Sequence, residues 1–387
     1  MAANSLTEIT GQSWLGRIGS SLKGVIFGLL LFVVAFPVLF LNEGRSVKTY
    51  KSIQEAGGTV ISVGADAVSA DNAGTLIHIT GKAVTEATLR DPIFGVTAQA
   101  LKLKRSVAMY QWKEKSHSEE KKKLGGGTET VTRYTYDKGW SDTPIPSADF
   151  YEPEGHKNPD AFPYVDEAYK AKPILVGAFE LSPSLVSRID NFTPLNITDD
   201  TPLPTNIAAN IGREAGKIYL GQHSATPTVG DLRVSFSVAL PTEVSIISQQ
   251  INNTFEAFQT KAGRAFERLQ IGQHSAEAMI AQAQQENKTL TWGLRLLGFI
   301  IMMIGLNLIF KPLSVLADVV PFLGALVGVG TGLIAFLIAI SLSFTVIAIA
   351  WVVFRPLLGI GLLVVAGAAT YVIITKLKAA RPQIVEG

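Results

Sequence analysis

The stretch GVIFGLLLFVVAFPVLFL, residues 24–41, is uncharged and continuously apolar. At about 1.5 Å of rise per residue, a helix of this length nearly crosses a hydrocarbon core of about 30 Å. Pro37 lies near its end, where a membrane helix tolerates proline. Arg17 and Lys23 precede the run, as in a signal peptide, but LFLNEGRS after it lacks a small-x-small cleavage site. The stretch therefore predicts an uncleaved transmembrane helix 1 at 24–42.

The composition of the chain points the same way. Of its 387 residues, 47% are hydrophobic, and the mean hydropathy of +0.28 is high for a soluble protein. Charged residues fill the middle of the chain and nearly vanish near both ends, which is the layout of a membrane protein. A formal net charge of +2 argues against a nucleic-acid binder, which usually carries a concentrated basic stripe. The absence of cysteine excludes disulfides, thiol nucleophiles and cysteine-ligated zinc.

Three further spans are predicted near the C-terminus. TWGLRLLGFIIMMIGLNLIF predicts transmembrane helix 2 at 291–311, with Lys311-Pro312 as its stop. The uncharged run that follows would measure roughly 54 Å as one helix, which is too long for a bilayer. Arg355-Pro356 is the best turn signal there, and it favours spans at 332–354 and 357–375. Three short spans in this region remain an alternative.

The charges that follow the last span predict a cytoplasmic C-terminus, and four spans then place the middle segment outside the cytoplasm. The predicted organisation is a cytoplasmic tail with an interfacial helix at 1–23, transmembrane helix 1 at 24–42, an extracytoplasmic α+β domain at 43–290, transmembrane helix 2 at 291–311, an interfacial or re-entrant segment at 312–331, transmembrane helices 3 and 4 at 332–354 and 357–375, and a cytoplasmic tail at 376–387.

The middle domain is expected to be rich in strands. Several of its segments are enriched in β-branched and aromatic residues and alternate polar with apolar, so one sheet face should be buried. These segments are TVISV (59–63), TLIHITG (75–81), LKLKRSVAMYQW (101–112), ETVTRYTY (129–136) and DLRVSFSVAL (231–240). KEKSHSEEKKKLGGGTE, at 113–129, predicts a solvated hairpin tip. Ser275 to Asn287 predicts a helix capped by Ser275 that runs into the second span.

Four residues of the C-terminal region are predicted to pack helices or to support assembly. Gly324, Gly328 and Gly332 form a small-xxx-small face, which lets helices approach closely in lipid. This face could pack within one chain or between chains. Asn307 is expected to form an interhelical hydrogen bond rather than to line an ion path.

Glu43 and Arg45 lie just beyond the first span, where they mark the predicted membrane exit. An ion pair between them would orient the chain, because a surface pair contributes little energy.

EGHKNPDAF, at 154–162, carries His156 and Lys157, which could in principle form an acid–base pair. The neighbouring glycine, asparagine and proline are turn formers, however. His156 is therefore predicted to cap or bridge a turn, and Asp160 to start a short helix after it. Contact of His156 and Asp160 with a partner is the alternative.

The sequence predicts no catalytic, cofactor-binding or metal-binding residues. It contains no HExxH or GxSxG motif, and no two histidines stand at a metal-ligand spacing such as i, i+4. Ser20 and Lys23 match a serine–lysine pattern, but that pattern is short and frequent by chance.

Ten stretches taken together resemble the LUMA family, also called the transmembrane protein 43 family. They are collinear from the first span to the last: LNEGR (41–45), DPIFGV (91–96), MYQW (109–112), RYTYDKGW (133–140), GHKNP (155–159), VGDLRVSF (229–236), TKAG (260–263), TWGLR (291–295), GLNL (305–308) and FRPL (354–357).

The resemblance implies a multi-pass α-helical membrane protein with four spans and a large β-rich α+β domain outside the cytoplasm. It also implies a scaffolding role, since animal members organise complexes in the endoplasmic reticulum and inner nuclear membrane. No enzymatic activity is established for the family. The chain looks like a bacterial relative that departs from the animal pattern around 240–285 and 312–330, which predicts an inner membrane location with the large domain in the periplasm.

The combined prediction is a non-enzymatic integral membrane scaffold that self-assembles or organises other membrane proteins or membrane domains. Its expected partners are membrane lipids, a second copy of the chain and other membrane proteins, with no nucleic acid, small-molecule substrate or cofactor. The alternatives are a channel or transporter component that uses the C-terminal helices and, less favoured, a periplasmic hydrolase.

Overall fold

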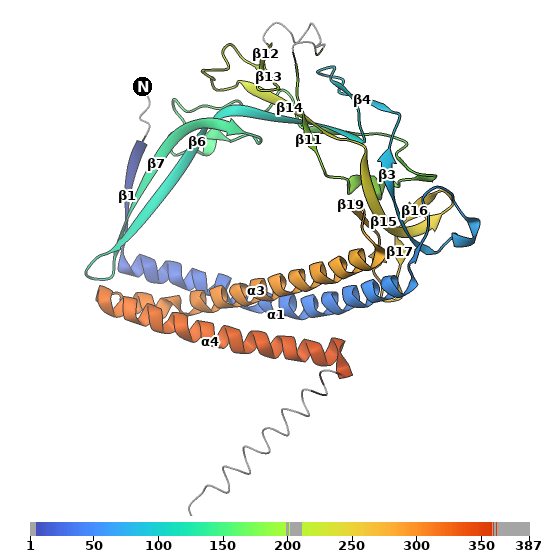
Figure 1. Cartoon of the computed structure of the whole chain (residues 1–387). Coiled ribbons are helices and arrows are strands. Elements are labelled where there is room, and N and C mark those ends of the chain that lie inside the picture. The colour runs from blue at the N-terminus through green and yellow to red at the C-terminus, as the bar shows by residue number, and fades with distance from the viewer. Residues whose placement is uncertain (1–4, 199–200, 202–210, 358, 360, 362–387) are drawn as a thin grey trace, which may run out of the picture. The chain divides into compact units, whose positions relative to one another are not determined.

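A computed structural model describes residues 5–198, 201, 211–357, 359 and 361. The chain divides into two compact units. The first unit contains Met1–Thr10, Ile53–Glu120 and Thr130–Gln282, and the second contains Gly11–Ser52, Lys121–Glu129 and Ala283–Gly387. Strands predominate in the first unit and long helices in the second (Figure 1).

An eight-stranded sheet contains the longest strands of the chain (Figure 1). Its order is β1-β7-β6-β14-β13-β12, with β11 added to β14 and β8 added to β6. The strands are β1 (Ser5–Gln12), β6 (Lys102–Lys122), β7 (Thr128–Ser141), β8 (Glu167–Lys170), β11 (Thr193–Leu195), β12 (Ile211–Glu214), β13 (Lys217–Leu220) and β14 (Leu232–Ala239). The pairing of β6 with β14 is antiparallel, with Val107 opposite Val234.

A second, seven-stranded sheet has the order β10-β9-β3-β15-β16, with β19 paired to β15 and β2 paired to β3. Its strands are β2 (Ile61–Ser62), β3 (Leu76–Val84), β9 (Leu175–Val176), β10 (Phe179–Glu180), β15 (Thr242–Ile251), β16 (Thr254–Glu256) and β19 (Arg268–Ile271). Two small antiparallel pairs complete the described strands: β4 (Thr88–Arg90) with β5 (Thr97–Gln99), and β17 (Phe258–Gln259) with β18 (Ala265–Phe266).

All five predicted strand segments contain strands of the structure, in β2, β3, β6, β7 and β14. The predicted alternation is clearest in β14, where the apolar residues are buried and the polar residues between them are half-buried. Because successive side chains of a strand point to opposite faces, this pattern places one face of the sheet in a core. That core contains Phe94, Leu103, Val107, Met109, Ile218, Val234 and Phe236.

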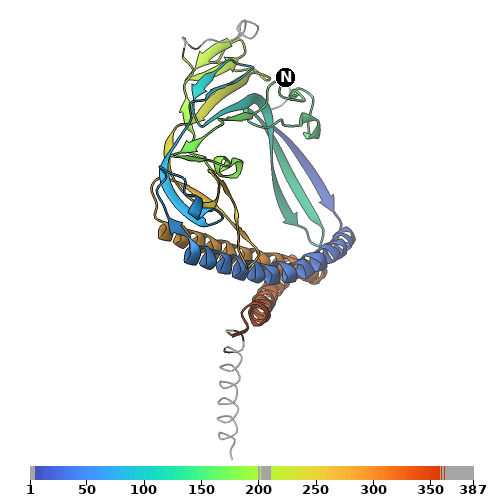
Figure 2. The ribbon, with the colours of Figure 1, turned by 90° about the vertical axis from the view of Figure 1, so that its right-hand side faces the viewer.

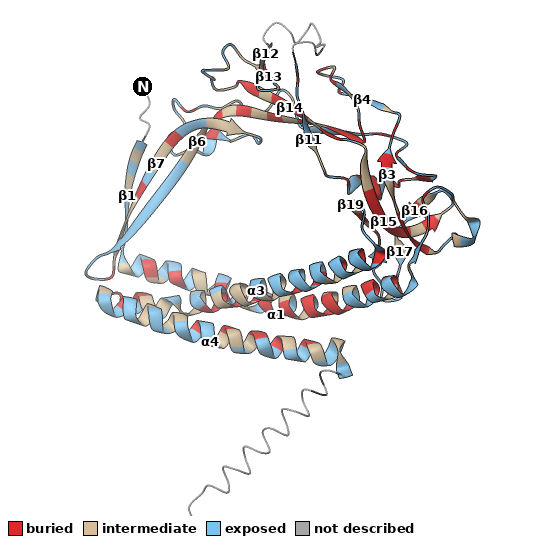
Figure 3. Ribbon diagram, in the orientation of Figure 1, coloured by how far each residue is buried: buried red, intermediate tan, exposed pale blue. Residues whose placement is uncertain are grey.

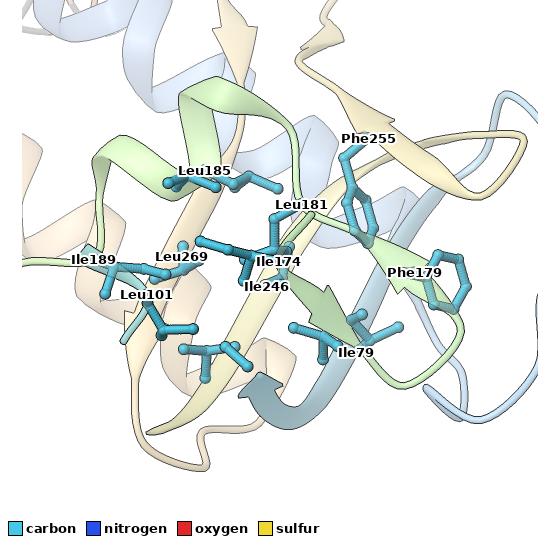
Figure 4. Packing of buried hydrophobic residues seen from close by; sticks show 14 of the residues in the cluster. Ile79, Leu101, Ile174, Phe179, Leu181, Leu185, Ile189, Ile246, Phe255 and Leu269 are labelled. Carbon is cyan, nitrogen blue, oxygen red and sulfur yellow. The ribbon is translucent and has the colours of Figure 1, made fainter. Parts of the chain in front are cut away.

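A second core lies on the other sheet, where β3 pairs with β15 and Ile79 stands opposite Ile246 (Figure 4). Phe179 stacks on Phe255 with ring centroids 5.3 Å apart. The short helix α2 (Pro183–Ser187) begins at its cap Ser182 and adds the fully buried Leu185 to this core. Burial of these side chains on both sheets gives the first unit its stability.

A buried ion pair fixes the loop at DPIFGV, between β4 and β5. The Asp91 carboxylate is fully buried and accepts hydrogen bonds from the backbone N–H groups of Ile93 (3.0 Å) and Phe94 (2.7 Å). Its other oxygen accepts a hydrogen bond from the Arg105 guanidinium and one from the Tyr169 hydroxyl at 3.1 Å. One carboxylate therefore holds a turn and satisfies a buried arginine at the same time.

Most of the second unit consists of the long helices α1 (Trp14–Thr59), α3 (Ala276–Ala317) and α4 (Pro321–Phe354). Helices α1 and α3 lie side by side in both views, and α4 is seen nearly end-on below them in the second (Figures 1 and 2). Each is long and apolar enough to cross a membrane. Exposed residues line all three (Figure 3), and large apolar side chains such as Phe27, Phe322 and Phe344 are among them. A surface of this kind is stable in lipid and not in water.

The helices run further than the predicted spans. The first does not end near 42 but continues to Thr59, and the second passes Lys311-Pro312 and ends at Ala317. The predicted helix from Ser275 does run into the second span, and Ser275 Oγ accepts a hydrogen bond from the Ala278 N–H. The segment 312–331 is the end of α3 and the start of α4, joined by a short turn.

The end of α4 at Phe354 agrees with the turn predicted at Arg355-Pro356. The fourth predicted span, 357–375, lies almost entirely outside the described residues, so four spans remain a prediction and three apolar helices are found.

Asp91→Ala should lower the stability of the first unit by about 3–5 kcal/mol, because Arg105 would remain buried without a counter-charge. The matched control is Lys115→Gln, which removes a surface pair with Asp137 whose side chains are 70% and 62% exposed, and it should cost at most about 1 kcal/mol. Thermal unfolding followed by near-ultraviolet circular dichroism measures both. Equal melting temperatures for the two variants would contradict a stabilising role of the buried Asp91–Arg105 pair.

Candidate functional site

Glu43 forms the centre of a polar cluster that joins all three long helices. Its carboxylate is fully buried and accepts hydrogen bonds from Arg295 Nε at 2.6 Å and Arg295 Nη2 at 2.9 Å. The indole Nε1 of Trp351 donates a third bond to the same carboxylate at 2.8 Å. Glu43 lies on α1, Arg295 on α3 and Trp351 on α4, so one carboxylate fixes the position of three helices. A two-pronged arginine–carboxylate pair is also directional.

A second set of hydrogen bonds extends this cluster along α1 and α3. Asn42 Nδ2 donates to the Thr291 carbonyl oxygen at 3.0 Å. The guanidinium of Arg45 donates to Asn287 Oδ1 at 3.1 Å and to Thr291 Oγ1 at 3.0 Å. Asn287 Nδ2 in turn donates to the Ser46 carbonyl oxygen at 3.0 Å. We call Asn42, Glu43, Arg45, Ser46, Asn287, Thr291, Arg295 and Trp351 the exit cluster.

Gly44 completes the exit cluster by leaving space. A Cβ at this position would lie 2.7 Å from the ring of Phe354, so a larger residue would push α4 away. Three of the stretches that resemble the family, LNEGR, TWGLR and FRPL, therefore meet at one place in the second unit. Their convergence is not visible in the sequence, where about 245 residues separate LNEGR from TWGLR and about 58 separate TWGLR from FRPL.

The predicted ion pair between Glu43 and Arg45 is replaced by a pair between Glu43 and Arg295. The first span was predicted at 24–42, with Glu43 and Arg45 just outside it. Because α1 continues, positions 43 and 45 point to different sides of one helix. The Arg295 guanidinium that binds Glu43 also lies over the Trp292 ring, at 4.6 Å.

A second buried charge lies at the turn between α3 and α4. The Asp318 carboxylate is 1% exposed and contacts Arg17 Nη2 at 2.5 Å and Lys122 Nζ at 2.7 Å. Burial by itself would raise the pKa of the Asp318 carboxyl, but the hydrogen bonds from Lys122 and Arg17 outweigh burial and hold that pKa below its usual value. Asp318 is therefore ionised at neutral pH. We call Arg17, Lys122 and Asp318 the turn cluster.

The tip of the β6–β7 hairpin, residues 121–129, belongs to the second unit together with the turn cluster. Arg17 Nη1 donates to the Gly126 carbonyl oxygen at 2.5 Å. Gly126 has a φ of +79°, and a Cβ there would lie 2.4 Å from the ring of Trp14, so this position requires glycine. The hairpin is confirmed, and residues 121–125 are exposed as a solvated tip predicts. The prediction did not foresee that Lys122, Gly125 and Gly126 also bind the turn between α3 and α4 and Arg17 of α1.

The predicted glycine face of α4 packs inside the chain. A Cβ at Gly328 would lie 3.8 Å from Ser314 Cβ, and one at Gly332 would lie 3.6 Å from Asn307 Oδ1, both of which are ordinary contacts with α3. At Gly324 a Cβ would lie 1.7 Å from Asp318 Oδ1, so Gly324 is needed for the turn cluster rather than for a helix crossing. Assembly between chains through this face remains a prediction.

A close crossing of α1 and α3 was missed by the sequence prediction. A Cβ at Gly305 would lie 2.7 Å from the Gly28 carbonyl oxygen and 2.7 Å from the Phe32 nitrogen, both backbone atoms. The same distance of 2.7 Å separates a Cβ at Gly28 from the Gly305 carbonyl oxygen. These two glycines let α1 and α3 touch backbone to backbone. Gly305 lies in the family stretch GLNL, which was the available signal.

Asn307 lies beside this crossing and is exposed. Its Nδ2 donates to the carbonyl oxygen of Met303, one turn earlier on the same helix, at 2.8 Å. The predicted interhelical hydrogen bond is therefore not made within the described part of the chain.

His156 is fully buried in the first unit. Its ring stacks on Tyr136, with centroids 3.9 Å apart, and meets the edge of Trp112 at 4.7 Å. His156 Nδ1 lies 2.9 Å from the Glu152 carbonyl oxygen, which bridges the turn as predicted. Burial and the hydrogen bond to Glu114 raise the pKa of Tyr136 to about 12, so its hydroxyl stays protonated and donates to that carboxylate.

Asp160 is exposed, and no helix follows it. The helix prediction is wrong here because Pro163 disfavours helical backbone at the residue before it. Phe162 and Tyr164 pack instead against the core of the eight-stranded sheet. Of the two predicted partner-contact residues, Asp160 is the one with an accessible side chain.

The described residues offer little for catalysis. They include no group of three or more His, Asp or Glu side chains able to hold a metal ion. A cavity of about 740 Å³ in the first unit is lined by Lys170, Lys172, Glu180, Glu256 and residues of α2, and neither His78 nor His156 lines it. The two clusters on the helices are saturated by contacts within the chain, so their arrangement suits a structural role.

Comparisons with known protein families and sequences identify relatives of one kind. The family model described as "Transmembrane protein 43" matches residues 109–356. Transmembrane protein 43 of Rattus norvegicus is 34% identical over 364 residues, which cover 91% of this chain and 90% of the relative. The Homo sapiens protein is 35% identical over 368 residues (92% and 90%), and the Drosophila melanogaster homolog is 30% identical over 363 residues (91% and 94%). No solved structure matches the chain.

Arg295→Met should lower the stability of the helix bundle by about 3–5 kcal/mol, because it leaves the Glu43 carboxylate buried and unpaired. The double variant Glu43→Gln with Arg295→Met should be more stable than Arg295→Met alone, since both charges are then absent. The measurement is the apparent melting temperature of the full chain in detergent. Additive effects of the two substitutions would show that the pair is not coupled.

Gly305→Ala and Gly324→Ala should both destabilise the bundle, the first by separating α1 from α3 and the second by displacing Asp318. Gly328→Ala should be tolerated because its Cβ meets only an ordinary contact. Gly330, which has open space around it, is the matched control, and Gly330→Ala should be neutral or should stabilise the helix by up to about 1 kcal/mol. Thermal unfolding monitored by circular dichroism ranks the four variants. Similar melting temperatures for all four would contradict the close approaches.

Proposed function

The chain belongs to the transmembrane protein 43 family, and we propose that it is a non-enzymatic scaffold that self-assembles and organises other membrane proteins or membrane domains. It is an integral membrane protein whose described residues form three apolar helices and a β-rich unit. In a bacterial cell the membrane would be the inner membrane, with the β-rich unit in the periplasm. Its proposed partners are membrane lipids, a second copy of the chain and other membrane proteins.

The observation that carries this proposal is the exposed carboxamide of Asn307 on an otherwise apolar helix surface. Among the described residues its Oδ1 accepts no hydrogen bond, and its second N–H is likewise available. Large apolar side chains such as Leu296 and Ile304 are exposed on the same helix. In lipid, an amide of this kind gains from bonding to a polar group on another helix, by about 0.6–2 kcal/mol.

The charged groups of the helices support a scaffold rather than a transport path. No Asp, Glu, Lys or Arg lies at 24–41, 296–310 or 321–354. Ion pathways usually carry inward-facing ionisable groups within the membrane. The buried carboxylates of the exit and turn clusters, Glu43 and Asp318, are instead bound by Arg295 and by Arg17 and Lys122.

An enzymatic reading gains no support from the relatives or from the site. The relatives are named only as transmembrane protein 43. His156, the histidine considered for acid–base chemistry, is enclosed by two aromatic rings and is fully buried. We therefore propose that the chain uses no catalytic residue, cofactor, small-molecule substrate or nucleic acid.

Asn307→Leu should weaken self-association by roughly tenfold, because the amide would no longer bond across the interface. The test is native mass measurement of the full chain in lipid nanodiscs over a range of dilutions, relative to the 41.5 kDa of one chain. Ser341→Ala is the matched control, since Ser341 is exposed on α4 and donates to the Leu337 carbonyl of its own helix. A wild-type chain that is strictly monomeric in lipid would sink the proposal.

A further inference from the structure

The hairpin tip, residues 121–129, carries an apolar side chain directly after a run of lysines. Leu124 is 88% exposed, although it is a large hydrophobic residue at a turn. Lys121 and Lys123 precede it and are exposed as well. Lys123 forms an ion pair with Glu129 at 2.5 Å, but this pair is at the surface, where such interactions contribute little and are easily exchanged.

The tip does not move freely, because the turn cluster holds it. Lys122, between the two flanking lysines, binds Asp318, and the Gly125 N–H donates to the Val319 carbonyl oxygen at 3.2 Å. The side chain of Leu124 is therefore presented outward from a fixed loop. A fixed apolar side chain in water is unfavourable, whereas it is stabilising at a surface that can bury it.

The residues around the turn cluster have the same character. Leu15 is 73% exposed at the start of α1, and Phe322 is 74% exposed at the start of α4, with Val319 and Val320 also exposed in the turn. Exposed aliphatic and aromatic side chains interleaved with lysines are typical of segments that lie in a membrane interface. Lysines near such a surface are attracted to anionic headgroups.

We propose that the hairpin tip binds an anionic phospholipid surface, with Leu124 in the interfacial layer and Lys121 and Lys123 at the headgroup phosphates. The turn cluster acts as the latch that holds the tip in this position. This interaction does not depend on self-assembly and would persist in a monomer.

The latch also has a consequence for membrane topology. Arg17 and Lys122 bind the same carboxylate, so a bilayer cannot separate them. Residue 17 and the hairpin tip therefore share one face of the membrane, so α1, the candidate span between them in the described part of the chain, would begin and end at that same face. This differs from the predicted topology, in which 1–23 is cytoplasmic and 43–290 is extracytoplasmic.

The lipid contact is tested with Leu124→Cys in the full chain, which has no cysteine of its own. A fluorescent label on this cysteine should be quenched by headgroup nitroxide lipids in nanodiscs that contain phosphatidylglycerol, and more weakly in pure phosphatidylcholine. The substitutions Lys121→Gln and Lys123→Gln should each reduce the preference for phosphatidylglycerol by about fivefold, because each removes one charge that attracts anionic headgroups. Quenching by aqueous iodide but not by lipid nitroxide, or equal quenching in both lipids, would overturn the proposal.

The latch is tested by combining the labelled cysteine with Asp318→Asn or with Lys122→Gln. Each should reduce quenching by the lipid nitroxide and increase the mobility of the label. Lys115→Gln, in the same strand but paired with Asp137 at the surface, is the matched control and should change neither. If Asp318→Asn fails to fold, Lys122→Gln still decides, because it leaves the Arg17–Asp318 pair in place. Unchanged quenching in Lys122→Gln would overturn the latch.

The shared membrane face is tested separately with an impermeant maleimide on sealed, oriented vesicles. Gly19→Cys reports the start of α1, since this position has open space around it, and Leu124→Cys reports the hairpin tip. Both cysteines should react from the same side of the vesicle. Reaction from opposite sides would overturn the latch, whatever the oligomeric state of the chain.

Discussion

The second unit depends on one buried carboxylate, Glu43, bound by Arg295 and by Trp351. Apolar helices in lipid have no hydrophobic force that selects one neighbour or one rotation. A two-pronged ion pair supplies that selection, because it forms at only one register of α1 against α3. The third donor, from Trp351, extends the same constraint to α4. The remaining polar contacts of the exit cluster are made in this same register.

Small residues let the helices pack closely in the register that the Glu43–Arg295 pair selects. Gly28 and Gly305 let the backbones of α1 and α3 touch, and Gly44 leaves room for the Phe354 ring. The buried face of α4 is lined by small side chains, including Ala335, Ala339, Ser343 and Ala350. Close approach increases dispersion contacts, which are a main source of helix association in lipid. Many large apolar side chains are left on the outside, which is the surface that a membrane would meet.

The boundaries of the apolar helices were the least predictable part of the fold. Hydropathy identifies where a chain is compatible with lipid, but α1 continues into polar residues because Asn42, Glu43 and Arg45 find partners on α3. Lys311-Pro312 was interpreted as a stop, yet α3 continues for a further turn and ends beside Asp318. The strands were easier to predict from the sequence, because buried and less buried residues alternate in β6 and β14 wherever one face of the sheet is buried.

Residue types and their order were sufficient to determine the class of this protein: apolar runs, strand alternation and a collinear set of short stretches are all local properties of the sequence. The sequence also identified the turn at His156 and the importance of LNEGR, without revealing what these residues contact. Only the tertiary structure decided that Glu43 pairs with Arg295, that Gly324 makes room for Asp318, and that Lys122 of a hairpin joins Arg17 of a helix. The physical reason is that each of these contacts joins residues that are far apart in the chain or turned by a helix, and charge and size alone leave several partners equally plausible.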